Sequence, residues 1–289
     1  MTSAAAPPDQ RRRPALLVAA ALKWVDRRPE VDALSGAVAH DPRWYGASDA
    51  DRAALEWALR LGEAWGAEVV AVTAGPVAAE AVLREALAVG ADRVLRVDLA
   101  EGAPSVQVAA ALAVVLRGAS AVCCGDWSLD RGSGAVPAYL ADRLGAAQAL
   151  GLVALEPTAA GVIEGDRRLD GGRRERLRVT APLVVSVEGA SARLRRAGLA
   201  ATLAAARCEV AVVAGPPARA TDPAPPAHTA PFRPRPRVRP GPDPELSALR
   251  RVRALLGDPG ERIAAELHTL DPEPAADLLL DRLATWGYR

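Results

Sequence analysis

The sequence predicts an α/β protein built on a doubly wound, mostly parallel sheet. Short apolar runs alternate with longer amphipathic stretches from Ala15 to about Ala214. Parallel neighbours need a crossover of this kind, usually a helix, to bring the chain back to the start of the next strand. Half of the residues are apolar but only 3% are aromatic, which suits an Ala/Leu/Val-rich sheet covered by helices.

Each element is justified by its length and apolar period, since short apolar runs bounded by turn residues favour buried strands and longer stretches of helical period favour amphipathic helices. The expected strands are Ala15–Ala21, Glu68–Thr73, Arg93–Val97 and Ala121–Cys124. The expected helices are Ala50–Trp65, Ala78–Val89, Val106–Leu116 and Gly134–Leu144. Ligands of such a fold bind at the carboxyl ends of the strands.

After Leu150 the pattern becomes β-rich, without intervening helices. The expected strands are Gly161–Gly165, Arg174–Thr180 and Pro182–Val187, with Asp170-Gly-Gly172 as a hairpin turn. We expect this β-rich addition to cover or extend one edge of the sheet.

Composition predicts four parts: a disordered tail (1–14), the α/β domain (15–214), a Pro/Arg-rich linker (215–244) and a C-terminal helical extension (245–289). Proline and arginine alternate in 231–240, which favours a solvated extended linker over a contact with an acidic surface or RNA. Apolar residues then recur at helical spacing: Leu246, Leu249, Val252 and Leu255, then Ile263 and Leu267, then Leu278–Leu280, Leu283 and Trp286. Because this segment is too short to form its own core, we expect it to pack on the main domain or on a partner.

Charge and cysteine usage exclude several classes of protein. The formal net charge is +1, so no global field favours nucleic acid or a membrane surface. Three cysteines and three scattered histidines give neither a disulfide framework nor a metal-ligand pattern. Arg11-Arg12-Arg13 precede a short apolar run, but a strand after a tail explains that run better than an export signal does. We expect a cytoplasmic protein that contacts no nucleic acid and inserts into no membrane.

One strand–loop–helix junction, 121–145, can hold an anion. The apolar run breaks into a glycine-rich loop and resumes with helical spacing, and free amides at a helix start attract phosphate. Gly132 and Gly134 allow close backbone approach, and Ser133 can cap the helix or touch phosphate. An ordinary βα turn explains the loop equally well, because its spacing matches neither common phosphate-loop pattern.

Catalysis by this chain alone has weak support. Ser128 and Ser133 have no obvious histidine partner in the sequence. Asp126 and Asp130 could act as acid and base in a transferase, but loop aspartates more often cap turns or bind the sugar of a ligand. We therefore expect a nucleotide-binding module and no catalytic residue.

Six motifs in order resemble the beta subunit of the electron transfer flavoproteins, from Leu16 to about Val210. They are Ala20-Ala-Leu-Lys-Trp-Val25, Glu56-Trp-Ala-Leu-Arg-Leu61, Gly75-Pro76, Leu83-Arg-Glu-Ala-Leu-Ala-Val-Gly-Ala-Asp-Arg93, Asp170-Gly-Gly172 and Pro182-Leu-Val-Val-Ser186. The fourth is the most specific. The resemblance implies an electron-carrier subunit of adenine-nucleotide α-hydrolase-like fold, and not an enzyme.

The resemblance also implies partners and cofactors. Such a subunit pairs with an alpha subunit that carries most of the FAD site, holds AMP itself, and transiently meets a donor dehydrogenase and an acceptor oxidoreductase. The implied cofactor-binding positions are Ala21, Ser48, Asp49, Ala50, Asp51, Ala74, Gly125, Asp126, Trp127, Ser128, Leu129, Asp130, Arg131, Gly132, Ser133, Gly134, Ala135 and Val136. The implied partner-docking positions are Arg195 and Leu199.

Two departures qualify the resemblance. The family's Asn-Gln-Thr-Gly at the helix start is Gly134-Ala-Val-Pro137 here, and two or three missing hydrogen bonds weaken AMP binding about tenfold or more. The docking segment is also altered: Leu199 is either an anchor for a partner or, with Leu203, part of an apolar helix core. The divergent tail resembles the actinobacterial type found with the mycofactocin redox system. A flavin-free ATP/AMP sensor of the same fold is the alternative function.

Overall fold

The computed structural model describes residues 16–216, 241–255 and 268–285. The chain divides into two units, Met1–Phe232 and Arg233–Arg289, each described by itself. The predicted tail (1–14), most of the predicted linker (215–244), and Ile263, Leu267 and Trp286 lie outside the described residues.

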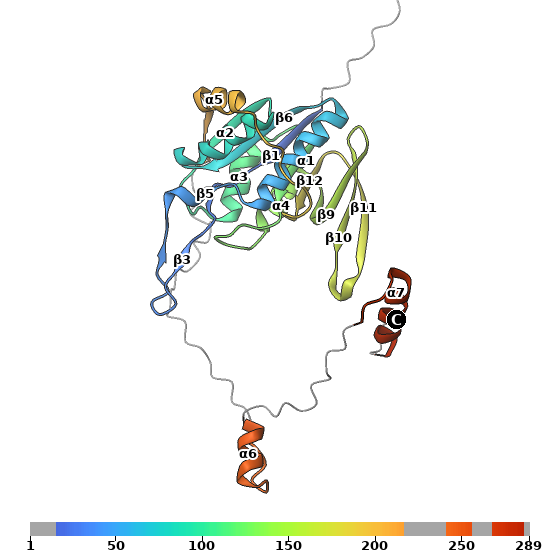
Figure 1. Cartoon of the computed structure of the whole chain (residues 1–289). Helices are drawn as coiled ribbons and strands as arrows, with labels where there is room; N and C mark the ends of the chain where they lie inside the picture. The colour runs from blue at the N-terminus through green and yellow to red at the C-terminus, as the bar shows by residue number, and fades with distance from the viewer. Residues whose placement is uncertain (1–15, 217–240, 256–267, 286–289) are drawn as a thin grey trace, which may run out of the picture. The chain divides into compact units, whose positions relative to one another are not determined.

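A nine-stranded sheet forms the centre of the first unit (Figure 1). Its order is β11-β10-β9-β12-β8-β1-β6-β7-β13. The strands are β1 (Leu17–Ala21), β6 (Glu68–Gly75), β7 (Arg93–Asp98), β8 (Ala121–Gly125), β9 (Ala147–Ala159), β10 (Val162–Arg168), β11 (Arg174–Thr180), β12 (Leu183–Val187) and β13 (Ala211–Ala214). Neighbouring strands pair in parallel along the part of the sheet that runs β9-β12-β8-β1-β6-β7-β13. The edge β11-β10-β9 is antiparallel. The predicted doubly wound, mostly parallel sheet is confirmed.

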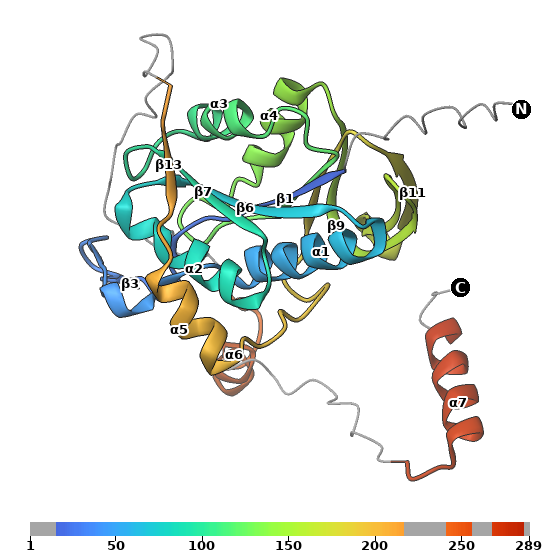
Figure 2. The ribbon, with the colours of Figure 1, turned by 90° about the horizontal axis from the view of Figure 1, so that it is seen from above.

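Helices cover both faces of the sheet (Figure 2). On one face lie α1 (Asp49–Trp65) and α2 (Glu80–Val89), with α5 (Leu199–Arg207) against α2; on the other lie α3 (Ser105–Val115) and α4 (Ala135–Leu144). Alternate β1 residues enter two separate cores: Val18 and Ala20 pack in the cluster of α1, and Ala19 and Ala21 in that of α3 and α4. This alternation is what a strand buried on both sides requires.

The order in which strands are added to the sheet reverses between β1 and β8, although the strands themselves stay parallel. After β1 it adds β6 and β7 on one side, then crosses through α3 to place β8 on the other side of β1. The helices that follow adjacent strands therefore leave on opposite faces and open a crevice at the carboxyl ends of β1 and β8. Open α/β sheets bind ligands at this kind of switch point.

The β-rich addition differs from expectation in one strand. Pro182–Val187 was predicted to belong to the addition. This prediction is wrong, because β12 lies inside the parallel sheet between β8 and β9. The antiparallel hairpin β10-β11 does extend the edge, turning at Asp170–Gly172 as expected, where Gly171 and Gly172 have φ of 70° and 75°. Within the nine-stranded sheet, β9 and β13 were not expected.

Residues 25–46 form two short antiparallel pairs that the sequence did not indicate. β2 (Val25–Asp26) pairs with β5 (Tyr45–Gly46), and β3 (Glu30–Val31) pairs with β4 (Val38–Ala39). Short 3-10 turns lie at Pro42–Trp44, Val77–Ala79 and Asp170–Gly172.

The described residues of the second unit include the helices α6 (Ala248–Leu255) and α7 (Pro272–Thr285). Both present exposed leucines, among them Leu249 and Leu255 in α6 and Leu279 and Leu280 in α7. Across the described residues of both units, no helix is long and apolar enough to cross a bilayer.

Candidate functional site

A cavity of about 520 Å³ opens at the carboxyl ends of β1, β6 and β8, at the switch point. Such a volume lies within the range of small-molecule and cofactor sites. The predicted site residues that line it are Ala21, Asp51, Ala74, Gly125, Trp127, Ser128, Leu129, Asp130, Arg131, Ser133, Gly134, Ala135 and Val136. Strands far apart in the sequence thus bring most of the predicted positions to one place.

The other predicted positions lie around this cavity without lining it. Ser48, Asp49 and Ala50, at the start of α1, line a neighbouring groove between α1, α2 and the segment 189–197. Asp126 and Gly132 belong to the loop but line neither space. Trp127 and Leu129 line both, so the loop separates the cavity from the groove.

The loop between β8 and α4 is shaped by two glycines with positive φ. Gly134 is the N-cap of α4 at φ 57°, and a Cβ there would fall 2.4 Å from the carbonyl oxygen of Asp126. Gly132, at φ 63°, donates its N–H to the Ser128 carbonyl at 2.8 Å. Ser133 is not the N-cap; its Oγ accepts from the Ala135 N–H at 3.4 Å.

The start of α4 offers fewer amides than usual. Pro137 is the third helical residue and has no N–H, so one of the donors that a helix start leaves free is missing. Gly134, Ala135 and Val136 line the cavity, and the Ala135 N–H already donates to Ser133 Oγ. The start of α4 therefore offers few free backbone donors to an anion.

Polar contacts tie this loop to distant elements. Lys23, just after β1, donates to Ser128 Oγ at 3.2 Å and to Asp130 at 2.6 Å, and the Arg131 guanidinium donates to the Gly102 carbonyl. Burial opposes ionisation of Asp130, but the hydrogen bonds from Lys23 and Ser128 hold its pKa below the ordinary aspartate value. Asp126 has no such cation, and burial raises the pKa of its carboxyl.

Asp51 lies under the loop, buried in the first turn of α1. Ser48 is the N-cap of α1: its Oγ accepts from the Asp51 N–H at 3.1 Å and donates to Asp51 Oδ2 at 2.8 Å. Gly125 makes room for this turn, since a Cβ there would lie 2.9 Å from Asp51 Oδ1. Burial raises the pKa of Asp51 to about 6, although the hydrogen bonds from Ser48 oppose the shift.

Asp51→Asn is expected to change how stability depends on pH. Because the folded pKa lies above the unfolded value of about 3.9, the contribution of Asp51 to the stability of the wild type should fall as pH rises from about 4 to 6. The variant lacks this slope, so relative to wild type it should gain about 2–3 kcal/mol between pH 4 and pH 7. Urea unfolding at both values measures this; a constant difference between the proteins would contradict it.

The segment 24–45 contributes four polar and aromatic side chains to the cavity lining that the sequence did not indicate. Asp26 is buried and bonds His40 Nδ1 at 2.9 Å, and Tyr45 stacks on Trp24 with ring centroids 4.1 Å apart. All four line the cavity. Burial and the nearby Glu101 raise the pKa of Tyr45. No local period predicts this grouping, because it depends on pairings within an irregular segment.

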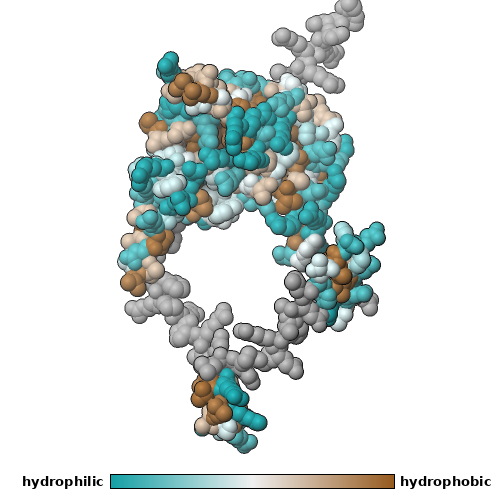
Figure 3. Space-filling model, in the orientation of Figure 1, coloured by the Kyte–Doolittle hydropathy of each residue, from teal (hydrophilic) through white to brown (hydrophobic). Residues whose placement is uncertain are grey.

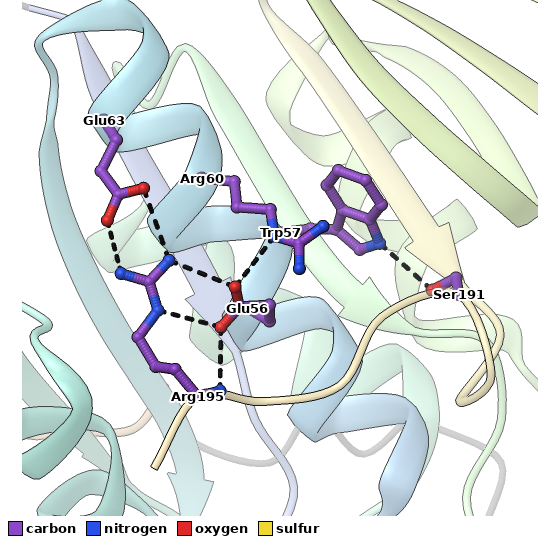
Figure 4. A network of polar contacts seen from close by, with 6 residues as sticks. All are labelled: Glu56, Trp57, Arg60, Glu63, Ser191 and Arg195. Carbon is purple, nitrogen blue, oxygen red and sulfur yellow. Dashed lines mark hydrogen bonds and ion pairs between the residues drawn. The ribbon is translucent and has the colours of Figure 1, made fainter. Parts of the chain in front are cut away.

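The predicted docking residue Arg195 is held within the chain (Figure 4). Its Nε and backbone N–H donate to Glu56 Oε2 at 3.0 and 3.1 Å, and its guanidinium also donates to Glu63. Glu56 also accepts from Arg60 Nε at 2.8 Å, and Trp57 Nε1 donates to Ser191 Oγ at 3.2 Å. These contacts fasten the segment before α5 onto α1.

The predicted anchor Leu199 is the first residue of α5 and is 76% exposed, and Leu203 is 52% exposed. Figure 3 shows apolar surface over α5. Within this chain these leucines are therefore not a helix core, which was the alternative interpretation. Arg195 binds the segment that leads into α5 to α1, so the exposed leucines lie on a helix whose N-terminal approach is held in place.

The fold and cavity define a doubly wound α/β protein with a small-molecule cavity at its switch point. A sequence model of the electron transfer flavoprotein domain matches residues 38–218, well over half of the chain, and the chain belongs to the electron transfer flavoprotein family. It is also similar to Protein FixA of Bradyrhizobium diazoefficiens, 32% identical over 171 residues, 55% of this chain and 59% of the relative. The chain thus spans less than two thirds of the length of this relative.

The predicted resemblance to this family is confirmed. Members of the family are flavin-associated electron carriers rather than enzymes. Among the described residues, no group of three histidine, cysteine, aspartate or glutamate side chains is placed to hold a metal ion.

Proposed function

We propose that this chain is the beta subunit of a heterodimeric electron carrier, which takes electrons from a flavin- or cofactor-linked dehydrogenase and passes them to an acceptor oxidoreductase. The observation that carries this proposal is the cavity at the switch point, bounded by the Gly125–Gly134 loop, in a chain of this family. The alpha subunit is the proposed stable partner and holds most of the FAD.

AMP fits the cavity by volume and by the chemistry of its lining. The phosphate would lie against the amides of Gly134, Ala135 and Val136, and the ribose hydroxyls suit the carboxylates at the rim, such as Glu101. The missing amide at Pro137 supports weaker binding than a complete helix start gives. The role of AMP here is structural, since it fills the crevice between β1 and β8.

FAD supplies the redox chemistry when it is bound. The side chains of this chain supply a support for the alpha subunit and a docking surface, for which the exposed Leu199 and Leu203 on α5 are the proposed contacts. Burial raises the pKa of Cys123 to about 12 and that of Cys124 well above the ordinary thiol value, so neither thiol is suited to redox exchange.

Copurification with the alpha-type partner tests the proposal. We expect a yellow heterodimer whose heat-released nucleotides, separated by chromatography, are FAD and AMP in nearly equal amounts. The chain alone should be colourless and should bind AMP with lower affinity than the heterodimer. A colourless homo-oligomer that binds ATP in preference to AMP would instead support the flavin-free sensor and overturn the carrier.

A further inference from the structure

We propose that Lys23 is the positioning residue that latches the loop Gly125–Gly134 in its anion-binding shape. This inference rests on the proposed nucleotide site but makes a separate claim: Lys23 acts through the loop and does not itself bind the phosphate. Its position just beyond β1, in the middle of the sheet, gives the latch a rigid base.

Little packing holds the middle of this loop, because residues 129–133 are all exposed. None of the residues from Gly125 to Val136 is buried, and the large side chains of Trp127 and Leu129 are 49% and 39% exposed. Two glycines with positive φ add backbone freedom that folding must restrict. Directed polar contacts must therefore select the loop conformation.

Lys23 supplies the contacts that reach the middle of the loop. Its Nζ bonds Ser128 and both oxygens of Asp130, residues more than a hundred positions away in the sequence. Asp130 in turn accepts the Arg131 N–H at 2.9 Å, so the ion pair and the turn at 128–132 support one another. The Arg131 contact with the Gly102 carbonyl joins the far side of the loop to a second loop rather than to the sheet.

The charges also favour a latch over a phosphate ligand. Asp130 already neutralises Lys23, and the cavity is lined by further carboxylates, Asp26, Asp51 and Glu101. To bind phosphate, Lys23 would have to leave Asp130 unpaired beside the incoming anion. The two roles therefore predict opposite effects for Asp130→Asn.

Hydrogen exchange of the full-length nucleotide-free chain tests the latch without relying on any ligand. We expect Lys23→Met and Asp130→Asn each to speed exchange of amides in 125–134 at least tenfold, with little further change in the double variant. Lys23→Arg should restore most of the protection. Arg43→Met is the matched control, because it removes another exposed ion pair, with Asp41 at 2.6 Å, from a residue that does not line the cavity.

AMP titration of the same proteins separates the roles. Both Lys23→Met and Asp130→Asn should weaken AMP binding about tenfold. Unchanged loop exchange in Lys23→Met would overturn the latch, as would tighter AMP binding in Asp130→Asn, which would assign Lys23 to the phosphate. If the wild type binds no AMP while its loop exchange behaves as expected, the proposed nucleotide site fails and the latch stands.

Lys23 is the only lysine of the chain. The rate at which the Lys23 amine is labelled, measured by mass spectrometry, therefore reports whether its ion pair with Asp130 is formed. We expect faster labelling in Asp130→Asn.

Discussion

Glu56→Gln is expected to lower the free energy of unfolding by about 2–3 kcal/mol at pH 7, because it breaks a buried, charge-assisted network. Glu56 is 4% exposed and accepts from the side chain and backbone of Arg195 and from Arg60. Glutamine keeps the shape but turns an NH₂ group toward these donors. Urea unfolding followed by circular dichroism measures the loss.

The effect should disappear in acid. Burial raises the pKa of Glu56, but the hydrogen bonds from Arg195 and Arg60 outweigh it and leave the pKa below the ordinary glutamate value. The contribution is therefore present above the unfolded pKa of about 4.3 and is lost as pH falls through the folded value.

Glu63→Gln is the matched control for this network. Glu63 pairs with the same Arg195 but its side chain is 62% exposed, so the loss should stay below about 1 kcal/mol. Equal losses from the two variants would contradict the assignment of Glu56 as the buried centre.

Gly134→Ala is expected to lower the free energy of unfolding by about 3 kcal/mol and to weaken AMP binding at least tenfold. The left-handed φ of 57° alone costs alanine about 1 kcal/mol. The added Cβ would also lie 2.4 Å from the Asp126 carbonyl oxygen, and backbone must move to relieve that contact. Chemical denaturation and calorimetric titration with AMP measure the two effects.

Gly145→Ala provides the comparison at the other end of α4. Gly145 has nearly the same φ, 60°, but a Cβ there would meet nothing within 4 Å. The substitution should cost about 1 kcal/mol and leave AMP affinity unchanged. If Gly145→Ala weakened AMP binding as much as Gly134→Ala does, the effect would belong to α4 as a whole and not to the loop.

The elements that the sequence predicted are those with strong local signals. α1 combines a serine N-cap, a helical apolar period and a C-terminal glycine, and its observed bounds differ from the expected ones by one residue. β9 has no comparable signal: Ala147–Ala159 is rich in alanine and leucine and lacks the alternation of a half-buried strand. β13 has only four residues, so its pairing with β7 is decided by the sheet and not by its own sequence.

The candidate site was predictable where it depended on the loop and not where it depended on long-range pairing. Glycines next to a strand end marked the cavity, and the family motifs added Ala21 and Ala74. Lys23 and Asp130 are 107 positions apart, and Arg195 and Glu56 are 139 apart. Only the folded sheet brings each pair together, so no spacing in the sequence indicates either contact.

The insertion of β12 between β8 and β9 has a consequence for the growing chain during synthesis. β8 and β9 have emerged before β12, yet each needs β12 as its parallel neighbour. Until residue 187 leaves the ribosome, both strands have unpaired N–H and C=O groups along an edge that is interior in the finished protein. A nascent chain paused before this strand would therefore be prone to mispairing along that edge, whereas one whose β12 has emerged can close the sheet between β8 and β9.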